Sequence, residues 1–144
     1  MHTLEITGLI QSAVTRLFER QPNILDFAPK TVQMELNLAH HLACELAQEF
    51  PGYDCDLGVS KHTRGHKRPD IIFHTRGSSA NDYLVVEVKY EGSDLSIDND
   101  LKNIHTRWFG MPYNYRFGAE VNFRNSRTAE VLVIANKSYI TPGH

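Results

Sequence analysis

Three charged residues stand in otherwise apolar stretches of this 144-residue chain, and their types are those that metal-assisted hydrolysis requires. Glu87 and Lys89 interrupt the apolar run 83–90, and Asp70 directly precedes the apolar residues 71–73. Carboxylate oxygens are the ligands that magnesium prefers, and a bound magnesium ion stabilises charge on a phosphate and lowers the pKa of a bound water. A nearby lysine can orient that water or offset negative charge in the transition state. These residues are therefore candidates for a hydrolytic site.

The two stretches that carry these charges have the patterns of neighbouring β-strands. Side chains alternate along a strand, so Glu87 and Lys89 lie on the same face of a strand predicted at 82–90, about 7 Å apart. A hairpin that joins this strand to the one predicted at 69–75 would place Asp70 beside Glu87. Two carboxylates and one ammonium would then meet at the surface of a sheet.

Glu35 adds a fourth charge, from a helix predicted at 31–50. At 100° per residue, Leu42 and Leu46 lie within about 20° of Glu35, and Ala39 lies within about 40°. Glu35 is therefore part of the apolar stripe of this helix. Because burying an unpaired carboxylate costs several kcal/mol, we expect Glu35 to have a partner in the folded protein.

The remaining elements follow from the spacing of apolar residues, which predicts the order α-α-β-β-β-α-β-β and a mixed sheet with helices packed on it. Helices are predicted at 3–20, 31–50 and 96–108, and strands at 53–60, 69–75, 82–90, 113–123 and 130–136. Ser96 is the predicted N-cap of the third helix. Residues 113–123 alternate as a half-buried strand does, whereas 130–136 lack alternation and predict a strand covered on both faces.

The composition is that of one ordinary domain spanning 1–144, with 41% hydrophobic residues and no repeat or linker. No apolar run approaches the roughly 20 residues of a membrane span and no signal-peptide layout is present, so a cytoplasmic protein is expected. Cys44 and Cys55 lack CxxC spacing and the eight histidines show no HExxH pattern, which indicates neither a disulfide framework nor a zinc site. The net charge of -2 leaves room only for a local nucleic-acid-binding patch.

The candidate residues also resemble the motif of a known family. They occur along the chain in this order: Glu35, Pro69-Asp70 and Glu87-Val88-Lys89. This pattern resembles the PD-(D/E)xK nuclease superfamily, whose core has the element order α-β-β-β-α-β, and the resemblance spans about residues 31–136. Some members also use a polar residue on the second core helix, where this chain offers Asp98 or Lys102.

The resemblance implies a restriction-endonuclease-like α/β fold, with a mixed central sheet flanked by helices. It also implies a metal-dependent phosphodiester hydrolase of the DNA endonuclease type, with Mg²⁺, or Mn²⁺ in its place, as the cofactor. Carried over residue by residue, it implies that Asp70 and Glu87 ligate the metal, that Lys89 positions the attacking water, and that Glu35 assists from the first core helix.

The most basic stretch of the chain, 61–68, directly precedes the strand that carries Asp70. Its cationic residues are Lys61, Arg64, Lys67 and Arg68. A loop of this kind at the mouth of the site is expected to hold the phosphates of a nucleic acid, with DNA as the expected partner. Arg124 and Arg127 would extend this patch. The alternative is an ordinary solvated loop, as charge runs commonly are.

Each site residue also has an ordinary structural explanation. Glu87 and Lys89 could form a solvent-facing ion pair on an edge strand, Glu35 could bond to a helix end or an arginine, and Asp70 could serve a turn. For the chain as a whole, the alternatives to a nuclease are a non-catalytic nucleic-acid-binding module of the same fold and a small α/β interaction domain. Retention of all four residues favours the nuclease over the first alternative, and the positions of the carboxylates in the structure test the second.

A single site of this kind breaks one strand of a duplex, and the chain has no second copy of the motif. Trp108 and Phe109, together with the aromatic residues of 113–123, offer apolar surface that can mark an interface. We therefore predict a symmetric homodimer, the commonest kind of oligomer. The alternative is that these aromatic side chains simply cover the sheet.

Overall fold

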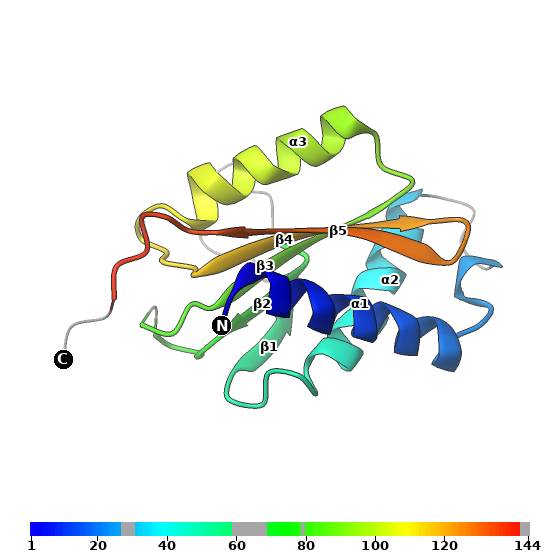
Figure 1. Cartoon of the computed structure of the whole chain (residues 1–144), viewed down its shortest axis with the longest axis horizontal. Helices are drawn as coiled ribbons and strands as arrows, with labels where there is room; N and C mark the ends of the chain where they lie inside the picture. The colour runs from blue at the N-terminus through cyan, green and yellow to red at the C-terminus, as the bar shows by residue number, and fades with distance from the viewer. Residues whose placement is uncertain (27–30, 59–68, 79, 142–144) are drawn as a thin grey trace.

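The structure, a computed structural model, has five strands in one mixed sheet with helices on both faces (Figure 1). It describes residues 1–26, 31–58, 69–78 and 80–141. The strands are β1 (Asp54–Leu57), β2 (Ile71–His74), β3 (Leu84–Tyr90), β4 (Phe117–Arg124) and β5 (Thr128–Ala135). They lie in the order β1-β2-β3-β4-β5, and β3 and β4 are parallel while the other neighbours pair antiparallel.

The helices divide between the two faces of this sheet (Figure 1). They are α1 (Thr3–Arg20), the short 3-10 helix η1 (Ile24–Asp26), α2 (Thr31–Leu46) and α3 (Asp94–Asn103), which continues into the π-helix η2 (Ile104–Trp108). The pair α1 and α2 packs on one face, and α3 with η2 covers the other. The core order α-β-β-β-α-β and the mixed sheet confirm the predicted restriction-endonuclease-like fold class. No helix in the described ranges is long and apolar enough to cross a membrane.

The parallel pairing of β3 with β4 requires a crossover, and α3 provides it. Ser93 caps this helix, with its side-chain oxygen accepting a hydrogen bond from the Ser96 backbone N–H at 3.2 Å. The predicted cap at Ser96 was therefore wrong by three residues, because Asp94 and Leu95 already belong to the first turn.

The two faces of the sheet have separate apolar cores. The larger core lies beneath α1 and α2, and the smaller one lies beneath α3 and η2, where Ile104 and Trp108 pack against Ile72 and Val85. A Cβ atom added to Gly118 of β4 would lie 2.5 Å from Ile104 Cγ2. The absence of a side chain at this position therefore allows η2 to close on the sheet.

Gly118→Ala is accordingly expected to destabilise the fold by about 1–3 kcal/mol, since an added methyl group in a packed core forces its neighbours to move. Urea unfolding measures the difference. Gly8→Ala is the control: a Cβ there meets nothing within 4 Å, on the exposed side of α1, and should stabilise the helix by roughly 0.5–1 kcal/mol. Equal stability of the Gly118 variant and the wild type would contradict the packing described.

Two expectations about the last strands were wrong. Strand β4, predicted to be half-buried, is buried on both faces from Phe117 to Phe123, because helices cover both faces of the sheet at this central strand. Strand β5, predicted to be covered on both faces, is instead at the edge of the sheet, and Leu132 on it is 50% exposed. The polar residues of β4 alternate because they face the interior beneath α3, where they do not meet bulk solvent.

The aromatic residues on which the homodimer prediction depended also lie in the cores. Those that are at most 8% exposed are Trp108, Phe109, Tyr115, Phe117 and Phe123. They cover the sheet, as the alternative explanation held, and they do not form an exposed apolar surface.

Candidate active site

The antiparallel pairing of β2 with β3 places Asp70 opposite Glu87. Ile71 pairs with Val86, and one further step along both strands aligns the two acidic residues. Their carboxyl groups share a hydrogen bond, and Asp70 Oδ2 also accepts one from the Val88 backbone N–H at 2.6 Å. The hairpin thus brings together the two carboxyl groups that the sequence proposed as metal ligands.

Both carboxyl groups have altered proton affinity because they are partly withdrawn from water. Burial raises the pKa of Asp70 to about 6, although the bonds from Val88 and Glu87 and the charge of Lys89 act to lower it. Burial also raises the pKa of Glu87 well above its ordinary value, and the negative charges of Asp70 and Asp100 add to this effect. Both side chains keep partial contact with solvent. The pair is therefore partly accessible, and among the described residues the positive charge that acts on both carboxyl groups is that of Lys89.

Lys89 lies on the same face of β3, two residues beyond Glu87. Its ammonium nitrogen is 3.6 Å from Asp100 Oδ2, on α3. Burial acts to lower the pKa of Lys89, but the surrounding carboxylates together raise it, in order of influence Asp100, Glu35, Glu120 and Asp70. The ammonium is therefore held charged among acidic side chains, and it is not part of a solvent-facing pair on an edge strand.

Glu35 reaches the same end of β3 from α2, on the opposite face of the sheet. Its Oε2 atom accepts a hydrogen bond from the Tyr90 backbone N–H at 2.9 Å, directly after Lys89 in the chain. The partner that a carboxylate on an apolar stripe needs is thus the backbone of β3. Glu35 is half-buried, and its charge acts on Lys89.

The sequence analysis missed two acidic residues that lie next to this group. Glu120 of β4 is beside Glu87 in the parallel register and is 1% exposed. Neither of its carboxyl oxygens meets an N–H or O–H donor within the described residues, but the Asp100 carboxyl is close enough to share a proton with it. Burial, followed by Asp100 and Glu87, raises the pKa of Glu120 to about 10.

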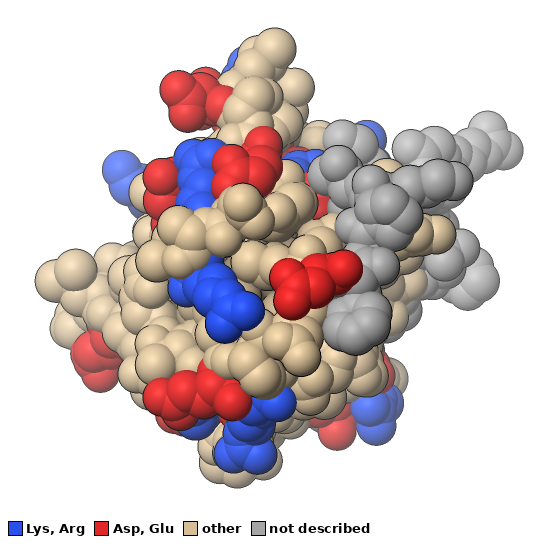
Figure 2. All heavy atoms as spheres, turned by 90° about the vertical axis from the view of Figure 1, so that its right-hand side faces the viewer, with Lys and Arg blue, Asp and Glu red and all other residues tan. Residues whose placement is uncertain are grey.

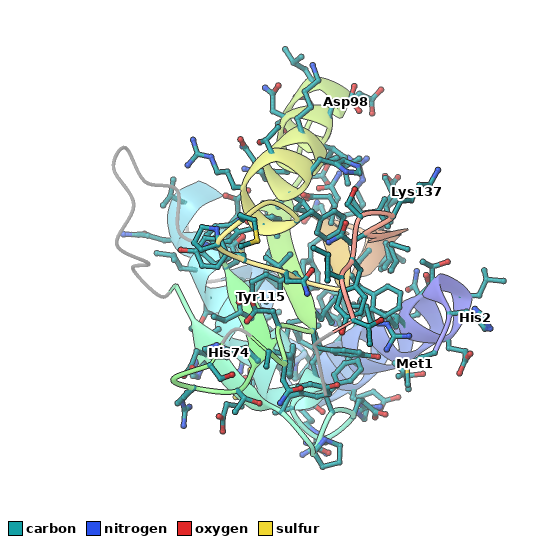
Figure 3. All side chains as sticks on the ribbon, turned by 90° about the vertical axis from the view of Figure 1, so that its left-hand side faces the viewer. Met1, His2, His74, Asp98, Tyr115 and Lys137 are labelled. Carbon is teal, nitrogen blue, oxygen red and sulfur yellow. The ribbon has the colours of Figure 1, made fainter. Side chains whose placement is uncertain are left out.

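The residue of α3 that faces the site is Asp100, and the two that the sequence suggested face away from it. Asp98 and Lys102 are exposed, and Figure 3 shows Asp98 on the side of α3 that is turned away from the sheet. Asp100 is buried. A signal for Asp100 existed in the sequence, because it lies three residues after Ile97 and four before Ile104, both of which belong to the apolar stripe of the helix.

Asn122 fixes the backbone that follows Lys89. It neighbours Lys89 in the β3–β4 register, and its side chain both accepts from the Gly92 N–H at 2.9 Å and donates to the Gly92 carbonyl at 3.1 Å. The loop between β3 and α3 is thereby tied to β4. This connection sets the position of α3, and of Asp100 on it, relative to Lys89.

The residues expected to bind phosphate either lie outside the described residues or bind other groups of the protein. The basic stretch 61–68 lies outside the described residues. Arg124 forms ion pairs with Glu91 and Glu130, and Arg127 donates a hydrogen bond to the Pro22 carbonyl, so both guanidinium groups are engaged within the protein. At the end of the molecule seen in Figure 2, basic and acidic side chains of the described residues are interspersed, without a patch of one sign.

No three His, Cys, Asp or Glu side chains among the described residues converge as a ready-made cage for a metal ion. Asp70 and Glu87 supply two carboxylates. Magnesium is usually held by one or two carboxylates and keeps several of its waters, so this donor set fits magnesium better than an ion that needs an all-protein cage.

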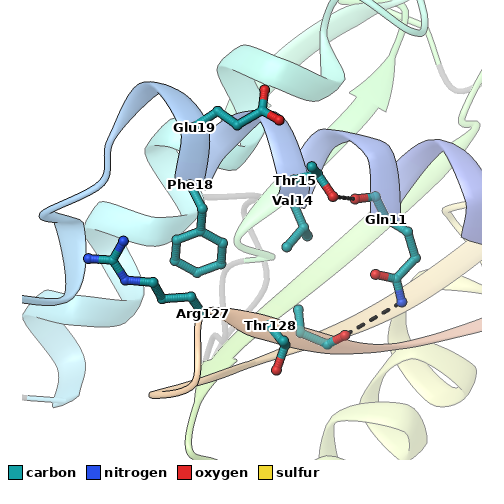
Figure 4. Close-up of a pocket in the computed structure, with 8 residues that line it drawn as sticks. Gln11, Val14, Thr15, Phe18, Glu19, Arg127 and Thr128 are labelled. Carbon is teal, nitrogen blue, oxygen red and sulfur yellow. Dashed lines mark hydrogen bonds between the residues drawn. The ribbon is translucent and has the colours of Figure 1, made fainter.

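A surface hollow elsewhere on the molecule offers no comparable chemistry. It has a volume of about 350 Å³ and lies between α1 and the β4–β5 hairpin, on the opposite face of the sheet from Glu87 (Figure 4). Its wall includes Val14, Phe18 and Arg127. The carboxylate group beneath α3 is therefore the better candidate for a catalytic site.

Comparison with known proteins adds a likeness to a solved structure. Neither the family models nor the curated proteins match the chain. Among solved structures, a chain in the cryoEM structure of a DrdV–DNA complex is similar, with a TM-score of 0.46 and 13% sequence identity. The match covers 88% of this chain but only 13% of that one. A likeness of this size does not decide what the chain does.

Proposed function

We propose that this chain is a metal-dependent phosphodiester hydrolase that acts on DNA as an endonuclease, with magnesium, or manganese in its place, as its metal. The proposal depends on one observation. Asp70 lies opposite Glu87, and Lys89 lies on the same strand as Glu87 and on the same face of that strand. Two desolvated carboxyl groups this close cannot both ionise without a cation beside them, and a divalent ion is the cation that this donor set fits.

The residues have separate roles in this proposal. Asp70 and Glu87 would hold the metal, which when bound stabilises charge on the phosphate and lowers the pKa of a water. The Val88 N–H orients the Asp70 carboxylate. Lys89 orients the attacking water and offsets negative charge on the phosphate. Glu35 fixes the backbone at the end of β3 and contributes negative charge near Lys89.

DNA binding is assigned to the basic stretch that precedes β2. Lys61, Arg64, Lys67 and Arg68 would contact phosphates, a role that needs cationic side chains close to the metal-binding carboxylates and no particular base sequence.

A cleavage assay on single-stranded, duplex and branched DNA tests this function. The wild type is expected to cut at least one of these substrates with magnesium or manganese and to stop when EDTA removes the metal. Lys89→Ala should be inactive, while Lys102→Ala, an exposed position on α3, should cut as the wild type does. Cleavage by Lys89→Ala, or cleavage in EDTA, would contradict the proposal. DNA binding without cleavage by the wild type would instead establish a non-catalytic binding module.

Each chain is expected to break one strand at a time, because it supplies one group of site residues. A symmetric homodimer, which would pair two sites, remains our proposal for cleavage of both strands, although its interface cannot be the buried aromatic residues. Light scattering at high protein concentration, with and without DNA, should give a dimer mass. A monomer mass under both conditions would rule the dimer out and leave nicking as the expected activity.

A further inference from the structure

The face of the sheet beneath α3 contains more acidic groups than two metal ligands would need. Asp70 and Glu87 are joined there by Asp100 and Glu120, which are both buried. The ammonium of Lys89 interacts electrostatically with all four carboxyl groups. Buried carboxyl groups without donors reduce stability, so their presence in this place calls for a role other than packing.

Asp100 is the acidic residue that meets the Lys89 ammonium directly. The ion pair measures 3.6 Å, and the Asp100 side chain is 6% exposed while that of Lys89 is 28% exposed. Asp100 Oδ2 has no hydrogen-bond partner among the described residues, and the ion pair with Lys89 offsets its burial, beside the proton that the Asp100 carboxyl group can share with Glu120. A lysine side chain has four rotatable bonds, and a buried anion at its tip restricts them.

The position of Asp100 also affects how closely the Lys89 ammonium approaches the Asp70–Glu87 pair. Asp70 directly precedes β2 and Glu87 lies on β3, whereas Asp100 lies on α3, which covers this face of the sheet. Of the carboxylates that attract Lys89, Asp100 acts most strongly, and Asp70 acts less than Glu35 or Glu120 does. An ammonium drawn onto Asp70 and Glu87 would occupy the place of a divalent ion. The ion pair with Asp100 instead draws the ammonium toward α3.

We propose that Asp100 is a positioning residue, which holds the Lys89 ammonium on the α3 side of the Asp70–Glu87 pair and so leaves these two carboxylates to bind a metal ion. This inference rests on the proposed function of the site. It assigns Asp100 no contact with substrate, since the residue acts through Lys89.

The first test observes Lys89 itself and needs no activity. In protein labelled with ¹³C at the lysine ε-carbon, NMR relaxation reports how freely each side-chain tip moves, and the Lys89→Arg spectrum identifies the Lys89 signal. We expect an ordered Lys89 tip in the wild type, a mobile one in Asp100→Asn, and an ordered one again in Asp100→Glu. Asp98→Asn, on the exposed side of the same helix, should leave the signal unchanged. An unchanged Lys89 signal in Asp100→Asn would overturn the inference.

The second test measures cleavage. Asp100→Asn should lower kcat about tenfold to a hundredfold, the range typical for outer hydrogen-bond partners of a metal site, with KM for DNA and the melting temperature not impaired. Asp100→Glu should recover most of the activity, and Asp98→Asn should lose none. Equal kcat in Asp100→Asn and Asp98→Asn would also overturn the inference. If Asp100→Asn does not fold, the Asp100→Glu variant provides the test, because it keeps the negative charge. An Asp100→Glu protein that has lost both the order of the Lys89 tip and the cleavage activity would contradict the proposed role of Asp100. If the wild type cuts no DNA, the proposed function fails, while the relaxation measurement still decides the position of Lys89.

Discussion

Glu87→Gln and Asp70→Asn are each expected to abolish metal-dependent DNA cleavage while the protein remains folded. Removing an outer partner of a metal ligand commonly costs 10–100-fold, so loss of a ligand itself should cost more than about a hundredfold. Amide side chains keep the size of the carboxyl groups but remove the negative charge that a divalent ion needs. Titration calorimetry with manganese and the cleavage assay measure the two losses in the same preparations.

The choice of amides follows from the hydrogen bonds at the site. Asp70 Oδ2 accepts from the Val88 N–H at 2.6 Å, and an alanine would leave that partly buried donor without a partner, at a cost of about 1–3 kcal/mol. Asparagine retains an acceptor oxygen. A lost activity in Asp70→Asn can then be attributed to charge, whereas the same loss in Asp70→Ala would mix charge with destabilisation.

Asp98→Asn is the matched control for these variants, since it removes one negative charge from an exposed position on α3. It should bind manganese and cleave DNA as the wild type does. Undiminished manganese binding in both Asp70→Asn and Glu87→Gln would show that the two carboxyl groups are not the metal site, and it would count against the proposed function even if cleavage were observed.

The part of this site that could be predicted from sequence is the part that local patterns determine. The alternation of side chains in a strand places Glu87 and Lys89 on one face without knowledge of the fold. A short polar connection between two strands makes a hairpin, and the structure has Asp70 opposite Glu87 as a consequence. Helical periodicity likewise identified Glu35 as a residue that needs a partner, although not that the partner is the Tyr90 backbone.

Glu120 was missed because its importance depends on a long-range contact. The parallel pairing of β4 with β3 places Glu120 beside Glu87, and no local pattern sets that register. The polar residues of 117–123 were interpreted as solvent-facing, since alternation commonly indicates a half-buried strand. In this fold α3 covers that face, so the same alternation marks a polar interior.

Asp100 was missed for a different reason. The sequence predicts a helix that begins at Ser96, whereas α3 begins at Asp94, and the polar residues proposed on it, Asp98 and Lys102, are exposed. The argument used for Glu35, that a carboxylate on an apolar stripe needs a partner, applies equally to Asp100 between Ile97 and Ile104. Its partner, the Lys89 ammonium, became apparent only from the packing of the helix on the sheet.

Glu120→Gln is expected to raise the stability of the protein at pH 8 and to leave it unchanged near pH 4. Burial, with Asp100 and Glu87 nearby, raises the pKa of Glu120 from 4.5 to about 10 in the folded protein. Between these values the folded protein keeps a proton that the unfolded chain has released, so the stability of the wild type falls as the pH rises through this window, by up to about 1.4 kcal/mol per pH unit. Glutamine has no proton to release and removes this dependence.

Thermal melts at pH 4 and pH 8 measure the effect. The variant should melt at least about 5 °C above the wild type at pH 8, since for a chain of this size 1 kcal/mol corresponds to roughly 2–4 °C. Glu19→Gln, at an exposed position on α1, should have the melting temperature of the wild type at both pH values. A Glu120→Gln protein that melts below the wild type at pH 8 would mean that the ionised carboxylate stabilises the fold, contrary to its burial without donors.

Manganese should reduce the difference between the two proteins if the acidic group is there to attract a cation. Glu120 lies beside Glu87, so the positive charge of a divalent ion at Asp70 and Glu87 lowers the pKa of Glu120 toward its value in the unfolded chain and thereby reduces the loss of stability at pH 8. The wild type is therefore expected to gain more in melting temperature from manganese at pH 8 than Glu120→Gln gains. An equal gain in both proteins would show that Glu120 does not contribute to the field at the metal-binding pair, and that its cost in stability is unrelated to the site.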